Sequence, residues 1–152
     1  MVGINHDEAY DENYISDILK NVKTIAMVGA SNDKTKFSYG VLRVLHETGY
    51  EMLPVNPSIA GSKIRGLEVF PNLKAINKKV DMVQVFRKAE DLPIVAKEAV
   101  EIGAKVLWGQ IGVKHAEAAI IAENAGLKVV MNRCPKIELF RPFWKPKLNL
   151  KI

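Results

Sequence analysis

The 152-residue sequence predicts an α/β protein: a single Rossmann-like, doubly wound domain with a five-stranded parallel sheet. Short apolar runs alternate with segments of helical spacing, which is typical of parallel βαβ units. Apolar residues make up 48% of the chain and charged residues 26%, as in ordinary globular domains. A chain of this length suits one hydrophobic core.

The runs that we expect to form the strands are residues 25–28, 52–55, 82–86, 105–108 and 127–131. An amphipathic helix over residues 7–20 precedes them, and a short helix is expected from Pro135. The helices between the strands are expected to begin at a cap on Ser38, near Asp91 and near Lys114. Right-handed crossovers then place helices on both faces. The Rossmann strand order 3-2-1-4-5 puts the switch point between the first and fourth strands.

We expect the domain to cover residues 1–140 and a basic, aromatic tail to cover residues 141–152. The net charge of +5 favours an anionic partner. The one cysteine, Cys134, excludes an intrachain disulfide and a cysteine-rich zinc site. No apolar run approaches the roughly 20 residues that span a bilayer, and residues 1–11 lack the pattern of a signal peptide. We therefore expect a cytoplasmic protein without a membrane partner.

Polar and cationic residues follow the predicted strands, at the edge where ligands of doubly wound sheets bind. The predicted helix that begins near Ser38 would add free backbone N–H groups, which favour a phosphate. These observations indicate a site for a phosphate-bearing ligand. Its candidate residues are Gly29, Ala30, Ser31, Lys34, Lys36, Ser38, Asn56, Pro57, Phe86, Arg87, Gln110, Gly112, Asn132 and Cys134.

The dinucleotide fingerprint is incomplete after the first predicted strand. The pattern G-x-G-x-x-G starting at Gly29 would need two further glycines, and the chain has Ser31 and Lys34 at those positions. An NAD site also needs an acidic residue after the second strand, where Asn56 stands. An NADP site remains open, because Lys63 or Arg65 could bind the additional phosphate.

The motifs of this chain, in their order, resemble those of the small stand-alone CoA-binding proteins. These proteins are relatives of the CoA-binding domain of the succinyl-CoA synthetase α subunit. The similar segments are residues 28–31, 37–41, 54–57, 69–73, 80–87, 108–112 and 130–138. The resemblance covers roughly residues 15 to 140, and it implies a Rossmann-like fold with CoA as the cofactor at the predicted edge. The chain departs from the family at Gly109, which is usually Met, and at Asn132, which is usually Asp.

Several candidates have both a binding and a structural interpretation. Lys34 and Lys36 either neutralise phosphates or are solvated lysines of the loop, and their presence together favours contact with an anion. Asn56 either holds the ribose or adenine or forms a turn before Pro57, and Arg87 either binds a phosphate through two N–H groups or makes a surface ion pair.

The remaining candidates have similar alternatives. Ser31 and Ser38 either donate to phosphates or serve the loop and the helix cap. Phe86 forms a wall of the adenine pocket or part of the core, Trp108 is expected in the core, and Gln110 is expected to contact the pantetheine arm.

The leading hypothesis for function is non-catalytic binding of CoA or an acyl-CoA. No histidine follows a predicted strand end or has the spacing of a triad or a metal site, so we expect neither catalytic residues nor a metal. The alternatives are a small NADP-linked oxidoreductase and a detached nucleotide-binding subunit of an acyl-CoA synthetase. Accordingly, the expected protein partners are a second copy of the chain or a synthetase subunit. Nucleic-acid binding through the tail is disfavoured.

Cys134 raises a further hypothesis. It is either a small buried apolar residue or a thiol within reach of bound CoA, since it follows the fifth predicted strand. Arg133 and the start of a helix near Pro135 would favour the thiolate, the form that exchanges with disulfides. In the second case, a mixed disulfide between CoA and Cys134 would form under oxidising conditions.

Overall fold

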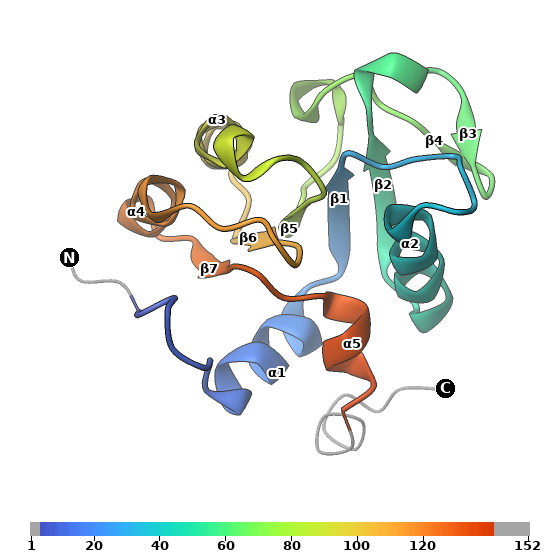
Figure 1. The fold of residues 1–152 in the computed structure, drawn as a ribbon. Helices are drawn as coiled ribbons and strands as arrows, with labels where there is room; N and C mark the ends of the chain where they lie inside the picture. Colours follow the sequence, from blue (N-terminus) through green and yellow to red (C-terminus); the bar gives the residue numbers. More distant parts are fainter. Residues whose placement is uncertain (1–3, 142–152) are drawn as a thin grey trace.

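Five parallel strands form the centre of the protein in a computed structural model that describes residues 4–141 (Figure 1). The strands are β1 (Thr24–Val28), β2 (Glu51–Val55), β5 (Met82–Val85), β6 (Val106–Gly109) and β7 (Lys128–Val130). All five were predicted, and the α/β class is confirmed. The predicted tail, apart from Arg141, lies outside the described residues.

The predicted strand order is wrong. The sheet has the order β2-β1-β5-β6-β7, so the third of the predicted strands lies beside the first and not beside the second. β2 is thus an edge strand, and Pro54, its fourth residue, has no N–H group to donate to a further strand. The outer side of β2 instead contacts a loop, where the Pro54 oxygen accepts a hydrogen bond from the Phe70 N–H at 2.9 Å.

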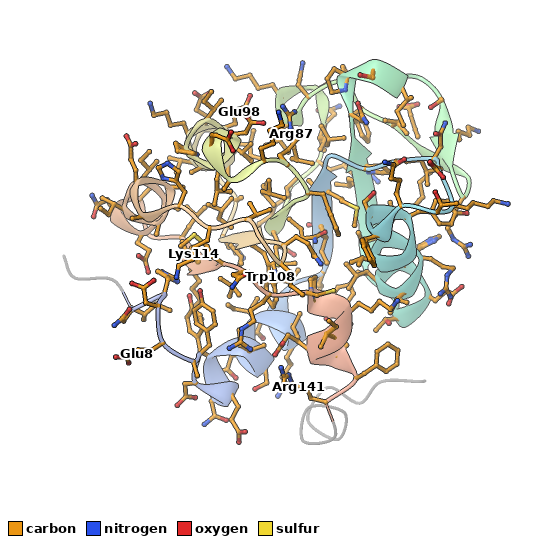
Figure 2. All side chains as sticks on the ribbon, viewed as in Figure 1. Glu8, Arg87, Glu98, Trp108, Lys114 and Arg141 are labelled. Carbon is orange, nitrogen blue, oxygen red and sulfur yellow. The ribbon has the colours of Figure 1, made fainter. Side chains whose placement is uncertain are left out.

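Helices cover both faces of the sheet, as predicted (Figure 1). One face carries α1 (Glu12–Asn21), α2 (Phe37–Thr48) and α5 (Pro135–Leu139), which share a core with Met27, Met82 and Trp108. The other carries α3 (Leu92–Glu101) and α4 (Ala116–Asn124), packed on Val83, Val85 and Leu107 among other residues. Trp108 is fully buried, as expected, and its indole N–H donates to the Arg133 oxygen (Figure 2).

Two predicted helix starts are wrong. The Asp11 carboxylate accepts a hydrogen bond from the Asn13 N–H at 2.7 Å, so α1 begins at Glu12, five residues later than expected. Lys36 occupies the cap position of α2 without a side-chain cap bond, and Ser38 is the second helical residue, where it is buried. Ser38 is therefore not a helix cap.

Short elements connect β2 to β5 and β5 to α3. They are the 3-10 helices η1 (Pro57–Ile59), η2 (Leu73–Ala75) and η3 (Ala89–Asp91) and the hairpin of β3 (Lys63–Ile64) and β4 (Leu67–Glu68). The two hairpin turn residues, Arg65 and Gly66, both have positive φ angles, as a type I′ turn requires.

Tyrosine hydroxyls cover the free edge of β7. The Tyr14 hydroxyl donates to the Val129 oxygen at 2.8 Å and accepts from the Val129 N–H at 2.9 Å. The Tyr10 hydroxyl accepts from the Met131 N–H at 2.8 Å. These contacts satisfy backbone groups that a neighbouring strand would otherwise bind. Within residues 4–141, none of the helices has the length and apolar character needed to cross a bilayer.

Candidate functional site

The carboxyl edge of the sheet opens between β1 and β5. From β1 the chain continues to α2 on one face, and from β5 it continues to α3 on the other, so these two strands form the switch point. Gly29 lies at this point with a φ angle of +90°. A Cβ atom there would lie 2.3 Å from the Phe86 oxygen, so only glycine permits this close approach of the two strand ends.

A cavity of about 430 Å³, here called the polar pocket, lies beside Gly29. Its lining residues are Val28, Gly29, Val55, Asn56, Pro57, Ser58, Phe86 and Arg87. The Asn56 side chain donates to the Ala30 oxygen at 2.8 Å and accepts from the Ser58 N–H at 2.9 Å, so it holds the two loops together. The Arg87 guanidinium pairs with Asp91 at 3.0 Å on the exposed rim (Figure 2).

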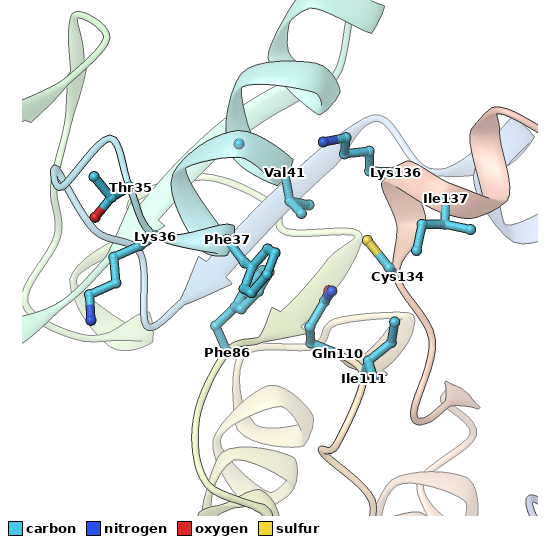
Figure 3. Close-up of a pocket in the computed structure, with 11 residues that line it drawn as sticks. Thr35, Lys36, Phe37, Val41, Phe86, Gln110, Ile111, Cys134, Lys136 and Ile137 are labelled. Carbon is cyan, nitrogen blue, oxygen red and sulfur yellow. The ribbon is translucent and has the colours of Figure 1, made fainter.

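A second cavity, of about 510 Å³, lies between α2 and α5 and is here called the apolar pocket (Figure 3). Its lining residues are Thr35, Lys36, Phe37, Gly40, Val41, Phe86, Gln110, Ile111, Cys134, Lys136 and Ile137. Phe86 contributes to both pockets, so they adjoin at this side chain. The sulfur of Cys134 and the amide nitrogen of Gln110 point into the space between the two helices (Figure 3).

The loop from β1 to α2 is ordered by its own side chains. The Ser31 hydroxyl accepts a hydrogen bond from the Asp33 N–H at 3.0 Å. The Asp33 carboxylate accepts from the hydroxyl and the N–H of Thr35, and these bonds hold the pKa of Asp33 below its ordinary value. Lys34 and Lys36 are exposed and make no ion pair among the described residues. The loop thus presents two lysines beside one carboxylate.

A sequence profile described as a CoA binding domain matches residues 23–139, which include every strand of this edge. The chain belongs to the CoA binding domain family. This confirms the resemblance carried by the motifs.

The chain is similar to the uncharacterized protein YneT of Bacillus subtilis (strain 168), with 38% identity over 123 residues; these cover 81% of this chain and 90% of that protein. The α subunit of ADP-forming acetate–CoA ligase I of Pyrococcus furiosus is 34% identical over 108 residues, which cover 63% of this chain and 23% of the subunit. The structure of a hypothetical protein from Pyrococcus horikoshii OT3 superposes with a TM-score of 0.83 at 32% identity, covering 91% of this chain and 96% of that one.

The CoA binding domain brings eight of the predicted site residues to the two pockets. They are Gly29, Asn56, Pro57, Phe86 and Arg87 in the polar pocket and Lys36, Phe86, Gln110 and Cys134 in the apolar pocket, with Phe86 in both. The other six line neither pocket. Ala30 and Ser38 are buried, Ser31 and Lys34 lie in the loop, and the Asn132 amide oxygen accepts from the Gly112 N–H at 2.8 Å. Asn132 and Gly112 therefore stabilise the β6 loop.

The domain also has pocket residues that the sequence reasoning missed. Phe37, Ile111 and Ile137 are large apolar side chains that remain exposed around the apolar pocket. Their residue types give no signal, because helix periodicity does not distinguish a pocket from solvent. Gln84, which lines neither pocket but donates a hydrogen bond to Gln110, was also missed; its position inside an apolar run is a signal, since a buried amide in a strand needs a partner.

Histidines and Arg65 do not add to this site. His6 hydrogen-bonds to Tyr10 and Glu123 and lines neither the polar nor the apolar pocket. The Arg65 guanidinium pairs with Glu47 in the last turn of α2 at 3.2 Å and lines neither pocket. Residues 4–141 contain no group of three or more His, Cys, Asp or Glu that could hold a metal ion.

Proposed function

We propose that this protein binds coenzyme A or an acyl-CoA at the carboxyl edge of its sheet without catalysing a reaction. The observation that carries the proposal is the match of the CoA binding domain to residues 23–139, a span that includes both pockets. CoA has a highly charged nucleotide end and a long, mostly apolar pantetheine arm. The polar pocket suits the first and the apolar pocket suits the second, and the two adjoin at Phe86.

The β1–α2 loop would serve the phosphates. Lys34 and Lys36 are the cations of this loop, and the first turn of α2 has backbone N–H groups without helical partners. Arg87 pairs with Asp91 and Arg65 with Glu47, whereas the two lysines make no ion pair among the described residues, so we assign the phosphates to the lysines.

Calorimetric titration with CoA, NADH and NADPH at one salt concentration tests the proposal. We expect CoA to bind most tightly, since Asn56 and not an acidic residue follows β2. Tighter binding of NADH or NADPH would contradict the proposal and favour an oxidoreductase.

The double variant Lys34→Ala, Lys36→Ala tests the role of the loop. It should weaken CoA binding by about 1–3 kcal/mol, because it removes charge-assisted contacts to phosphate. Exposed lysines contribute little to stability, so the melting temperature without ligand should hardly change. The control Lys97→Ala, Lys128→Ala removes the same charge from exposed positions on α3 and at the start of β7. Equal losses in both double variants would mean that only net charge matters.

A second candidate is a detached nucleotide-binding subunit of an acyl-CoA synthetase. The observation that favours it is the 34% identity to the acetate–CoA ligase α subunit, of which the matched region forms 23%. Such a role needs a partner that supplies the catalytic groups. Co-expression with a candidate ligase subunit, followed by size-exclusion chromatography, would reveal a stable complex; an unchanged elution volume of this chain would speak against that partner.

The mixed disulfide with Cys134 remains a prediction. The Cys134 thiolate would attack the S–S bond of oxidised CoA disulfide, form a new S–S bond and release one CoA thiolate, so that no further oxidant is needed. Intact mass after treatment with CoA disulfide should show one CoA adduct, which dithiothreitol reverses and Cys134→Ser abolishes. The absence of an adduct at full CoA occupancy would leave Cys134 as a packing residue, in keeping with its burial.

A further inference from the structure

Gln84 is a buried amide in the middle of the sheet that packing does not explain. It lies on β5 between Met27 of β1 and Trp108 of β6, and it is fully inaccessible to solvent. Its Nε2 donates to the Gln110 Oε1 at 2.9 Å, but its own Oε1 has no hydrogen-bond partner. A buried amide oxygen without a partner costs about 1–3 kcal/mol. A methionine or leucine would fill the same space without this cost.

The one polar contact of Gln84 leads to the apolar pocket. Gln110 lines that pocket and is itself mostly buried. Its backbone is held in place, since its N–H donates to the Val85 oxygen at 3.1 Å and its oxygen accepts from the Val113 N–H at 2.8 Å. The side chain of Gln110 is thus fixed at both ends, by the backbone and by Gln84.

The direction of the Gln84–Gln110 bond determines what the pocket presents to a ligand. Because the Gln84 N–H occupies the Oε1 atom of Gln110, the Nε2 atom of Gln110 is left to face the pocket. Figure 3 shows this nitrogen pointing into the cavity, between Phe86 and Cys134. The amide therefore offers N–H donors and no acceptor to a bound molecule.

The walls around this donor are apolar. Val41, Phe86, Ile111 and Ile137 surround it together with the thiol of Cys134. Such surroundings exclude water. A hydrogen bond formed there is therefore strengthened, and a donor without a partner is costly. The chemistry that fits is a carbonyl oxygen flanked by aliphatic groups.

We propose that Gln84 is a positioning residue that holds Gln110 as an N–H donor for a carbonyl oxygen of the ligand in the apolar pocket. The inference rests on the proposed function, in which this pocket takes the pantetheine end. Such a carbonyl oxygen belongs either to an acyl thioester or to an amide of the pantetheine arm. In both cases Gln84 affects binding only through Gln110.

Calorimetry with four ligands tests the proposal and separates the two sources of the carbonyl. Butyryl-CoA has the thioester and the amides, CoA and the thioether S-butyl-CoA have only the amides, and adenosine 3′,5′-bisphosphate has neither. The variants are Gln110→Met, Gln84→Met and their combination. Met82→Leu is the control, because Met82 is a fully buried residue of the same strand and the same face.

We expect Gln110→Met to weaken butyryl-CoA binding about tenfold and Gln84→Met about threefold to tenfold, the loss of one hydrogen bond. The double variant should bind no more weakly than Gln110→Met alone. Adenosine 3′,5′-bisphosphate binding should be unchanged in all variants. If the variants lose affinity for butyryl-CoA but bind CoA and S-butyl-CoA as tightly as the original chain does, the hydrogen bond of Gln110 goes to the thioester. If they lose affinity equally for all three CoA compounds, the hydrogen bond goes to an amide of the pantetheine arm.

A purely structural role of Gln84 predicts a different pattern. It would lower the melting temperature of Gln84→Met and leave the affinity for CoA compounds unchanged, and that result would overturn the proposal. So would losses that multiply in the double variant. Failure of the unsubstituted chain to bind any CoA compound would instead overturn the proposed function, and this inference with it.

Discussion

Replacing Gly29 by alanine should disrupt the switch point of the sheet, and Gly126 provides a matched control. Both glycines have a φ angle of +90°, so an alanine at either position is strained by about 1–2 kcal/mol. Both substitutions also reduce the entropy of the unfolded chain equally. The two positions differ in their surroundings. A Cβ atom at Gly126 meets nothing within 4 Å, whereas one at Gly29 would lie 2.3 Å from the Phe86 oxygen.

The steric contact at Gly29 should therefore add to the strain. The Phe86 oxygen is a backbone atom, and the Phe86 N–H donates to the Val28 oxygen at 2.8 Å, so relief of the contact requires β1 and β5 to separate at their ends. Forced overpacking of this kind costs about 1–3 kcal/mol. We expect Gly29→Ala to lower the free energy of unfolding by about 2–5 kcal/mol and Gly126→Ala by about 1–2 kcal/mol.

Urea unfolding of both variants measures this difference by linear extrapolation. A CoA titration should show a loss of affinity for Gly29→Ala and none for Gly126→Ala, since only Gly29 borders the polar pocket. Equal destabilisation by the two substitutions would refute the argument, because it would mean that the strand ends accommodate a Cβ atom freely.

Two further predictions concern stability away from the site. Tyr14→Phe should lower the free energy of unfolding by about 1–3 kcal/mol, measured in urea, because both backbone groups of Val129 lose their partner; no change would mean that water replaces the hydroxyl. Burial raises the pKa of Asp81, but the backbone N–H groups of Lys23 and Thr24 outweigh it and hold the pKa below its ordinary value of 3.8. The stabilisation by Asp81 is thus present above pH 4 and is lost as the pH falls below it. The difference in free energy of unfolding between the original chain and Asp81→Asn should therefore shrink from pH 6 to pH 2. A constant difference would contradict this.

The sequence predicts the layers of the fold better than the order of the strands. Apolar runs and helical spacing locate all five strands, because the spacing of buried residues within one strand or helix can be seen in a few consecutive residues. The place of the third strand in the sheet does not follow from such a local pattern, since the strand orders 3-2-1-4-5 and 2-1-3-4-5 can both be built with right-handed crossovers. Pro54 carries the missing information. A proline inside a strand is tolerated at the edge of a sheet, which argues against an order in which a third strand pairs with β2.

The candidate site was less sensitive to this error. Gly29, Asn56 and Phe86 each follow a strand, and the carboxyl ends of parallel strands meet at one edge in either order. Cys134 lies beside the site for a different reason from the one predicted. β7 is three strands away from β1, but the Arg133 N–H donates to the Gly109 oxygen at 3.2 Å, and the chain thus turns back along the edge toward α2. The apolar pocket results from this return, which no local pattern predicts.

Polar residues at strand ends and polar residues inside strands need different reasoning. Ser31 and Asn56 each had a ligand-binding and a loop-forming interpretation, and their side chains do bind the backbone of their own or a neighbouring loop, as Ser and Asn commonly do in turns. Gln84 lies where an apolar side chain would be more stable, and its oxygen has no partner. A residue that violates the local rule without a structural gain is a stronger indication of function than one that follows it. By this criterion the unpaired oxygen of Gln84 is a stronger argument for the proposed ligand contact of Gln110 than any feature of the polar loop residues.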